Sequence, residues 1–344
     1  MKNKLHTTSV KAWDSMLRAI NQAKKSIYLE MYILSDDTRH SHNFIEKLKE
    51  KARKNIRIII VADSYGSSSL TEDTIKKIRD TGAEFLFFSH WLRHIHRKIL
   101  IVDEEVAFIG GVNIGKAFIK WNDLQLELHG KIVKKIISSF AYTYEIAGGK
   151  NAQILAHRRN RIPGKRKSWL LEHSPSKNIH TLKSHYIKKI NNAKKTIQII
   201  TPYLIPPRWL ISLLDNAIKR NVQVEIFVPL KSDMPFVNGM NYRFMQKLHY
   251  LGIKFFLLKT MNHSKLLLID STEALIGSQN LDFISFNINF EAGVFMRDQK
   301  IIQELKAVIN KWKEQSREFK PRKYKRHLSD YFFALIHRLL HPIL

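Results

Sequence analysis

The sequence predicts an α/β protein made of two copies of one folding unit. Three observations predict it: the same landmarks recur in order in both halves of the 344-residue chain, short apolar runs alternate with helical segments, and one histidine–lysine–aspartate pattern occurs once in each half. Strands that alternate with helices are typical of a sheet covered by helices. Two such halves that share an interface would place a site between them.

The first element is an amphipathic helix. Trp13, Met16, Leu17 and Ile20 recur at helical spacing, which indicates a helix docked on the protein rather than the continuous apolar core of a signal peptide. No stretch approaches the ~20 apolar residues that cross a bilayer. We therefore expect no transmembrane segment.

The repeat begins with a short landmark in each half. Residues 23–27 read Ala-Lys-Lys-Ser-Ile and residues 193–197 read Ala-Lys-Lys-Thr-Ile, and they open apolar runs over 27–34 and 197–205. A helical segment, a turn and a second strand follow in each half. Fixed-order self-similarity of this kind indicates an internal repeat.

The offsets within the two copies agree. Asn55 lies 41 residues before His96, and Asn221 lies 42 residues before His263. Each copy then closes with two β-rich runs joined by a turn, at residues 99–102 and 106–111, and again at residues 266–269 and 274–279. The two halves are therefore a duplication.

Each half carries one copy of the pattern H-x-K-x4-D. Its members are His96, Lys98 and Asp103 in the first half and His263, Lys265 and Asp270 in the second. Two copies at matching places of a repeat are hard to ascribe to chance. On a strand, residues i and i+2 share a face, so each histidine and its lysine project together. A buried lysine requires an anionic partner, which a phosphate would supply.

The match continues downstream of the pattern. Asn113 and Asn280 each lie 17 residues after their histidine and follow a glycine-containing turn, and an Asn amide can donate to a phosphoryl oxygen. The turns differ, with Gly111 in one and Ser278 in the other, so we expect the two half-sites to bind phosphate unequally.

An acidic residue follows in each half at nearly the same distance. Asp123 lies 27 residues after His96, and Glu291 lies 28 after His263. A carboxylate beside a histidine fixes its tautomer and stabilises the imidazolium. We therefore predict that these two carboxylates orient the histidines.

The doubled pattern resembles the signature of the phospholipase D superfamily. The resemblance implies a duplicated phospholipase D-like fold, with two mixed-sheet α/β halves related by a pseudo-two-fold axis and the active site between them. It also implies a ping-pong mechanism in which His96 is the nucleophile and His263 the general acid and base. Neither a metal nor a cofactor is expected, because two lysines supply the positive charge.

The other members of the pattern take roles from the same resemblance. The side chains expected to stabilise the phosphoryl oxygens are Lys98, Lys265, Asn113 and Asn280. We expect Asp103 and Asp270, although they belong to the catalytic pattern, to be structural and to tie the motif loop together.

Three further segments are similar to bacterial cardiolipin synthases of the short type without transmembrane helices. They are residues 201–207 (TPYLIPP), 289–291 (NFE) and 121–123 (WND). This resemblance implies transfer of a phosphatidyl group to phosphatidylglycerol through a phosphohistidine. A phospholipase D-type hydrolase, a metal-independent nuclease of the same superfamily and a non-catalytic membrane scaffold are the alternatives.

The composition favours an anionic binding partner and excludes cysteine-based chemistry. Lys and Arg number 58 against 30 Asp and Glu, a net charge of +28, which favours an anionic phospholipid bilayer or nucleic acid as partner. An AT-rich genome that enriches surface lysine is an alternative cause. With no cysteine, the chain has no disulfide, no thiolate nucleophile and no zinc site with Cys ligands.

The C-terminal segment favours the bilayer over nucleic acid. Residues 320–326 hold five cations in seven positions, and an apolar stripe at helical spacing follows at Leu328, Tyr331, Phe332, Leu335, Ile336, Leu339 and Leu340. This pattern is typical of a helix in an anionic bilayer interface, with a helix packed on the protein's own core as the alternative. We predict a peripheral membrane protein, at the cytoplasmic face of the bacterial inner membrane.

Four segments follow as the expected domains. They are a first half over 1–149, a basic linker over 150–179, a second half over 180–318 and a basic amphipathic tail over 319–344. Within the linker, residues 157–167 read HRRNRIPGKRK, either a solvated loop or a segment that contacts phosphate or a lipid headgroup.

Overall fold

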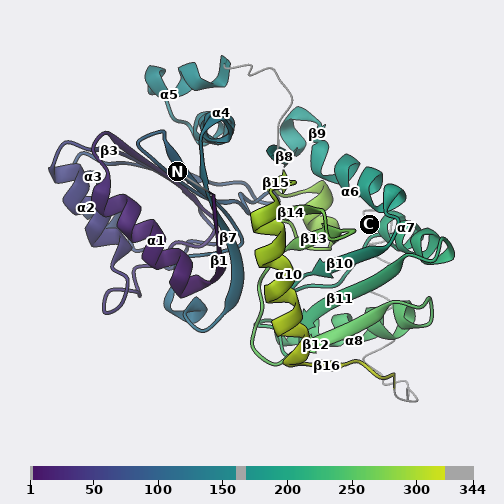
Figure 1. Ribbon diagram of the computed structural model, residues 1–344. Helices are drawn as coiled ribbons and strands as arrows, with labels where there is room; N and C mark the ends of the chain where they lie inside the picture. The colour runs from purple at the N-terminus through teal and green to yellow at the C-terminus, as the bar shows by residue number, and fades with distance from the viewer. Residues whose placement is uncertain (1–2, 160–167, 322–344) are drawn as a thin grey trace.

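The computed structural model describes residues 3–159 and 168–321. Figure 1 shows two α/β halves side by side, the first in purple and blue and the second in green and yellow. The first sheet has seven strands in the order β1-β7-β6-β5-β2-β3-β4. They are β1 (Lys4–Thr8), β2 (Ser26–Met31), β3 (Arg57–Asp63), β4 (Glu84–Phe88), β5 (Lys98–Val102), β6 (Val106–Gly110) and β7 (Asn122–His129).

The second sheet has nine strands in the order β16-β12-β11-β10-β13-β14-β15-β8-β9. They are β8 (Ser168–Ser174), β9 (Ile179–His180), β10 (Thr196–Ile200), β11 (Gln223–Pro229), β12 (Lys254–Leu258), β13 (Leu266–Ile269), β14 (Glu273–Gly277), β15 (Glu291–Met296) and β16 (Ser316–Glu318).

The strand order confirms the duplication. Strands β2 to β7 occur in the order β7-β6-β5-β2-β3-β4, and strands β10 to β15 occur in the equivalent order β15-β14-β13-β10-β11-β12. In both sheets three neighbouring strands run parallel and the others antiparallel, so each sheet is mixed as expected. Each copy of the H-x-K-x4-D pattern therefore lies on a central strand, β5 or β13.

Helices cover the outer face of each sheet (Figure 1). In the first half they are α1 (Ser9–Gln22), α2 (Phe44–Arg53) and α3 (Glu72–Arg79), and in the second α6 (Thr181–Asn192), α7 (Arg208–Lys219) and α8 (Pro235–His249). The expected N-terminal helix is α1: Trp13, Met16 and Ile20 are buried, and Thr8 caps the helix by accepting from the Lys11 amide.

Two longer helices close the halves. After β7 comes α4 (Lys131–Ile146), and after β15 comes α10 (Gln299–Glu314). The shorter helices are η1 (Lys116–Phe118), α5 (Ala152–Ala156), η2 (His157–Arg159), η3 (Pro175–Lys177) and α9 (Phe283–Asn287). No helix among the described residues combines the length and apolar character needed to cross a bilayer.

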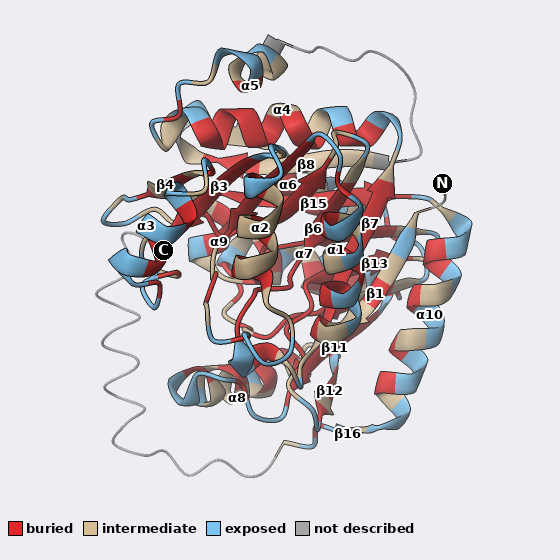
Figure 2. Ribbon diagram, turned by 90° about the vertical axis from the view of Figure 1, so that its left-hand side faces the viewer, coloured by how far each residue is buried: buried red, intermediate tan, exposed pale blue. Residues whose placement is uncertain are grey.

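The core has three parts that follow the alternation of side chains along the strands. On β5, Leu100 packs into the outer core of the first half, whereas Ile99 and Ile101 point into a central core. The central core also contains Leu266 and Leu268 of β13, so both halves contribute to it. Figure 2 shows the inner strands buried along most of their length. Shared burial of this kind fixes the position of one half relative to the other.

The segment expected to be a basic linker, residues 150–179, contains regular structure. It forms α5 and then β8, which pairs antiparallel with β15 from Ser168↔Met296 to His173↔Glu291. Its apolar residues Leu170 and Leu171 extend the second sheet. Residues 160–167 of this segment, and residues 322–344 of the expected tail, lie outside the described part of the chain.

Candidate active site

His96 and His263 lie just before their strands, in extended segments that the other half holds. The His96 amide donates to the Phe290 carbonyl over 3.0 Å, and the His263 amide donates to the Asn122 carbonyl over 2.8 Å. Return bonds run from the Phe290 amide to His94 and from the Asn122 amide to Met261. Each catalytic segment is therefore positioned by backbone of the opposite copy and not only by its own sheet.

The two orienting carboxylates are also exchanged between the halves. His96 Nδ1 lies 3.0 Å from Glu291 Oε1, and His263 Nδ1 lies 2.9 Å from Asp123 Oδ2. Both rings are nearly enclosed, with 7% of His96 and 4% of His263 exposed. The carboxylates predicted to orient the histidines do contact them, but each serves the histidine of the other copy.

Burial sets the charge of both imidazoles. It lowers the pKa of His96 to about 4, although the Glu291 carboxylate opposes the shift. Burial also lowers the pKa of His263, and the charge of Lys265 adds to that effect. Both rings are therefore neutral at pH 7. Because each Nδ1 faces a carboxylate, the ring proton lies on Nδ1 and the lone pair on Nε2.

Lys98 and Lys265 are buried beside the histidines as the alternation predicts. Each ammonium donates to the backbone carbonyl of its own histidine, His96 or His263. Burial lowers the pKa of Lys98 well below its usual value, with Lys265 adding to the shift, and burial lowers the pKa of Lys265 to about 8.

The lysines also show that the two motifs form one charge cluster. The charge of Lys265 acts on His96 of the other half, and the charge of Lys98 acts on His263. The carboxylates of Asp123 and Glu291 favour the charge of both lysines, but burial outweighs them. A phosphodiester bound between the two ammonium groups would add a further negative charge.

Asn113 and Asn280 both lie buried at this end of the sheets. The Asn113 side-chain oxygen accepts from the Ile33 amide, which leaves its NH₂ group for other partners. The Asn280 side-chain oxygen is buried without a hydrogen-bond partner within the described residues. Asn113 thus retains a donor beside its motif, whereas the free atom of Asn280 is an acceptor and its side chain also hydrogen-bonds the Asp282 carboxylate.

Asp103 and Asp270 lie at the opposite ends of their strands. The Asp103 carboxylate accepts from the amides of Lys24, Lys25 and Ser26, and Asp270 accepts from those of Lys194, Lys195 and Thr196. Five strand residues separate Asp103 from the catalytic end, a distance of about 16 Å. These aspartates tie the turn after the motif strand to the start of β2 or β10.

Aromatic side chains to which the sequence assigned no role in the site border both histidines. The Tyr32 ring lies 4.8 Å from the His96 ring, and the Lys98 ammonium lies 4.9 Å from the centre of the Tyr32 ring. On the other side, the Trp121 ring lies 5.4 Å from His263 and the Tyr203 ring 6.4 Å. Burial raises the pKa of both tyrosines, so their hydroxyls stay protonated as donors.

A second histidine–carboxylate pair stands beside His96 and was also missed. His94 Nδ1 lies 3.2 Å from Asp63 Oδ1, and Asp63 Oδ2 accepts from the Ile95 amide at 2.8 Å. The sequence signal for this pair is weak because the second half does not repeat it. The position equivalent to Asp63 is Pro229, at the end of β11, and the position equivalent to His94 is Met261, two residues before His263.

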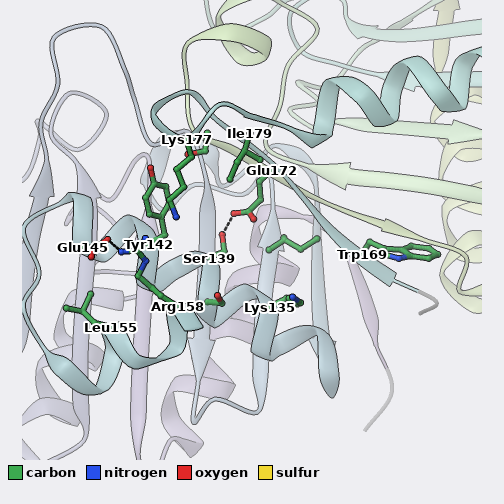
Figure 3. A pocket seen from close by; sticks show the side chains of 13 residues that line it. Lys135, Ser139, Tyr142, Glu145, Leu155, Arg158, Trp169, Glu172, Lys177 and Ile179 are labelled. Atoms are coloured by element: carbon green, nitrogen blue, oxygen red, sulfur yellow. Dashed lines mark hydrogen bonds and ion pairs between the residues drawn. The ribbon is translucent and has the colours of Figure 1, made fainter. Parts of the chain in front are cut away.

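A cavity of about 810 Å³ lies apart from this cluster, between α4 and β8 (Figure 3). Lys135, Tyr142, Arg158, Trp169, Glu172 and Lys177 are among its lining residues. It contains none of the motif residues. Glu172, which lines it, lies 3.4 Å from the guanidinium of Arg97, the residue after His96.

The comparisons with known proteins agree with this geometry. Residues 16–143 and 186–312 each match the family model described as cardiolipin synthase, PLD-like domain. The chain is 30% identical to a cardiolipin synthase of Listeria welshimeri, in an alignment that covers 96% of this chain and 73% of that protein. It is 28% identical to a cardiolipin synthase of Clostridium perfringens, over 85% of this chain and 66% of that protein.

A solved structure shows the same fold at greater sequence distance. The phosphatidylserine synthase of Haemophilus influenzae superimposes with a TM-score of 0.78 over 99% of this chain and 93% of its own, at 15% identity. That identity supports the fold alone. The family match over both halves and the curated relatives at 30% identity go further, and the chain belongs to the cardiolipin synthase family of phospholipase D-like proteins, enzymes of the phosphatidyltransferase and phospholipase D type.

Proposed function

We propose that this protein transfers a phosphatidyl group from one phospholipid to the terminal hydroxyl of phosphatidylglycerol, through a phosphohistidine on His96. The observation that carries the proposal is the pair of buried imidazoles, each with Nδ1 against a carboxylate of the other half. An imidazole held in this way presents Nε2 as nucleophile or base.

The first step breaks the bond between phosphorus and the donor's alcohol. His96 Nε2 forms a bond to phosphorus while His263, protonated in the substrate complex, gives its Nε2 proton to the departing oxygen. The negative phosphodiester favours that protonation because it offsets the cations that depress the pKa of His263. The free alcohol is released, and the phosphatidyl group remains on His96.

The second step reverses the roles around the same phosphorus. Neutral His263 takes the proton of the incoming hydroxyl, its oxygen bonds to phosphorus and the N–P bond to His96 breaks. With phosphatidylglycerol as both donor and acceptor, the products are cardiolipin and glycerol.

Four side chains are positioned to stabilise the phosphoryl oxygens during both steps: Lys98, Lys265, Asn113 and Asn280. They are buried and held in place before the reaction, and one preorganised donor of this kind contributes roughly 2.7–4 kcal/mol to lowering a barrier. Because the two ammonium groups supply the positive charge, we propose that turnover requires no metal ion.

The proposed setting is an anionic phospholipid bilayer, with the protein bound peripherally at the cytoplasmic face of the bacterial inner membrane. The net charge of +28 and the phospholipid substrate support this setting.

Product analysis tests the function directly. Purified protein is incubated with phosphatidylglycerol vesicles, with and without EDTA, and the lipids and free glycerol are measured by mass spectrometry. We expect cardiolipin and glycerol in equal amounts under both conditions. Phosphatidic acid without cardiolipin would show a hydrolase, and cleavage of single-stranded DNA without lipid turnover would show a nuclease.

The roles of the two histidines are tested with a donor that carries p-nitrophenol as its alcohol, which leaves without a proton. His263→Ala should release nitrophenol once and accumulate a phosphatidyl adduct, seen as intact mass after an alkaline quench. His96→Ala should give no adduct and lose at least about 10⁴-fold in kcat/KM. An adduct on His96→Ala and none on His263→Ala would reverse the assignment.

A further inference from the structure

Exposed apolar side chains gather at one end of the molecule. Eight large apolar residues are exposed within the described part of the chain. Seven of them lie at the catalytic end of the sheets, five in loops and two, Phe236 and Ile284, in the first turns of α8 and α9. We call these seven the active-site rim: Tyr65, Trp91, Leu92, Leu230, Met234, Phe236 and Ile284. The eighth, Tyr250, follows α8 at the opposite end, before the first residue of β12.

The rim of the first half is built directly onto catalytic segments. β3 and β4 run parallel and end side by side at Asp63 and Phe88, so the loops after them leave from one edge. Tyr65 follows β3, and its ring lies 5.1 Å from the His94 ring. Trp91 follows β4 in the loop that leads into the His96 segment and is 84% exposed.

The second half repeats this arrangement with different residues. β11 and β12 end side by side at Pro229 and Leu258, and Leu230 and Met234 occupy the loop after β11. That loop touches the site, because the Tyr203 hydroxyl donates to Asp233 over 2.9 Å. Ile284 lies in α9, and the side chain of the next residue, Ser285, accepts from the Asn280 backbone amide. The rim therefore surrounds the site from both halves.

Cations accompany the rim. Lys231 and Lys259 follow β11 and β12, Arg93 follows Leu92, and Lys116 and Lys120 lie on the segment after β6. Among the residues that the structure describes, none of these five forms an ion pair with a carboxylate. Apolar side chains next to unpaired cations fit a surface that is apolar within and anionic at its face.

An exposed apolar surface of this kind is unfavourable in water and marks an interaction site. The reacting groups lie beneath it, since His96 and His263 are almost wholly enclosed. The phosphate of a phospholipid substrate must therefore enter the protein while its acyl chains remain shielded from water. Insertion of the rim into the bilayer satisfies both needs.

We propose that the active-site rim inserts into an anionic phospholipid bilayer and places the catalytic entrance against the lipid headgroups. The choice of lipid substrate rests on the proposed function, whereas the insertion itself is a property of the active-site rim. A second copy of the chain is the other occupant that such a surface could take.

Trp91 reports insertion in the full chain. The difference in emission between wild type and Trp91→Phe isolates its signal in the presence of phosphatidylglycerol vesicles that contain brominated lipid. We expect this signal to shift to the blue and to be quenched. A tryptophan placed by Tyr250→Trp in the Trp91→Phe background is the matched control and should stay unquenched. An unquenched Trp91 signal would overturn the proposal.

Binding and turnover separate the rim from the chemistry. The variant Trp91→Ser/Leu92→Ser/Leu230→Ser/Met234→Ser should sediment with anionic vesicles at least about tenfold more weakly than wild type. Its ratio of activity on vesicles to activity on a monomeric short-chain substrate should fall by a similar factor, while Tyr250→Ser keeps both values. Because the four side chains are exposed, thermal unfolding should stay close to wild type.

The outcomes distinguish this proposal from the proposed function. If wild type turns over neither substrate but Trp91 is quenched, the function fails and the insertion stands. Equal vesicle binding by the rim variant would overturn the insertion even if cardiolipin forms. Concentration-dependent dimerisation of the wild type that the rim variant abolishes would assign the surface to a second copy and overturn it as well.

Discussion

The surroundings of His96 and His263 differ although the backbone around them is repeated. His96 has a polar setting, with Glu291 at its ring, the Asp63–His94 pair beside it and a Tyr32 edge contact. His263 faces the shorter Asp123 and the indole of Trp121. The duplication thus preserved the two histidines and allowed their neighbours to diverge.

One part of the difference is a matter of side-chain length. A Cβ on Gly111 would lie 2.2 Å from Asp123 Oδ1, so Asp123 packs against a glycine. Glu291 is one methylene longer, and the Ser278 hydroxyl donates to its carboxylate. The sequence predicts unequal phosphate binding by the two half-sites, and this stays a prediction; in the structure the Ser278 hydroxyl contacts Glu291. The pairs Gly111–Asp123 and Ser278–Glu291 are two solutions to placing a carboxylate at a histidine Nδ1.

The largest effect that separates the two half-sites is expected from the carboxylates. Glu291→Gln and Asp123→Asn should each lower kcat by about 10²–10⁴-fold, because a neutral amide no longer fixes the tautomer or stabilises the imidazolium. The p-nitrophenol donor distinguishes the two variants, because its leaving group needs no proton from His263. With this donor, Asp123→Asn should still show the initial burst of nitrophenol release, whereas Glu291→Gln should not. Equal bursts would mean that the half-sites are interchangeable in the first step.

The pH dependence of stability, compared between wild type and a His96 variant, isolates the titration of His96. Folded His96 takes up a proton near pH 4, whereas unfolded histidine does so near its ordinary value of 6.5. Between these values the unfolded chain binds more protons, so the free energy of unfolding falls as the pH drops from about 6.5 to 4. The loss approaches ~1.4 kcal/mol per pH unit and totals about 3 kcal/mol.

Urea unfolding of wild type and His96→Gln between pH 7 and pH 4 measures this difference. The wild-type slope should exceed that of His96→Gln by nearly one proton, and the exposed His40→Gln should keep the wild-type slope. Parallel curves for wild type and His96→Gln would show that His96 titrates normally in the folded protein.

Features that depend on local pattern could be predicted from the sequence. The helix that carries Trp13 and Met16, the two motif strands and the turn at Asp103 follow from periodicity and spacing, and the repeat supplied an internal check. The exchange of Glu291 and Asp123 between halves could not be predicted. Spacings of 27 and 28 residues give the distance of a carboxylate along the chain, whereas the exchange depends on how the two halves pack around their shared central core.

Features that occur in only one half could not be predicted from the sequence either. Asp63 and His94 are far apart in sequence and have no counterpart in the second half, so no internal comparison selects them. The strand β8 directly follows the basic segment 157–167, whose charge led to the prediction of a linker. The apolar residues Leu170 and Leu171 indicated a strand there. Side chains that act once, or that pair across a docked interface, leave little trace in a single sequence.

The far ends of the motif strands should behave alike, in contrast to the catalytic ends. Asp103 and Asp270 have φ angles of 52° and 50°, and the Oδ1 atom of each accepts from three backbone amides at 2.7–3.2 Å. Removing these acceptors leaves amides without partners, so Asp103→Ala and Asp270→Ala should each lower the free energy of unfolding by about 1–3 kcal/mol, with equal values in the two halves.

The asparagine variants separate the acceptor from the charge at these turns. Asp103→Asn and Asp270→Asn keep an Oδ1 acceptor and suit positive φ, so each should cost less than its alanine counterpart. Urea unfolding gives the stabilities, and kcat per folded molecule should remain near wild type because the turns lie seven residues, about 23 Å of extended chain, from the histidines. A large fall in kcat for one alanine variant alone would show that the asymmetry of the catalytic ends extends through the whole strand.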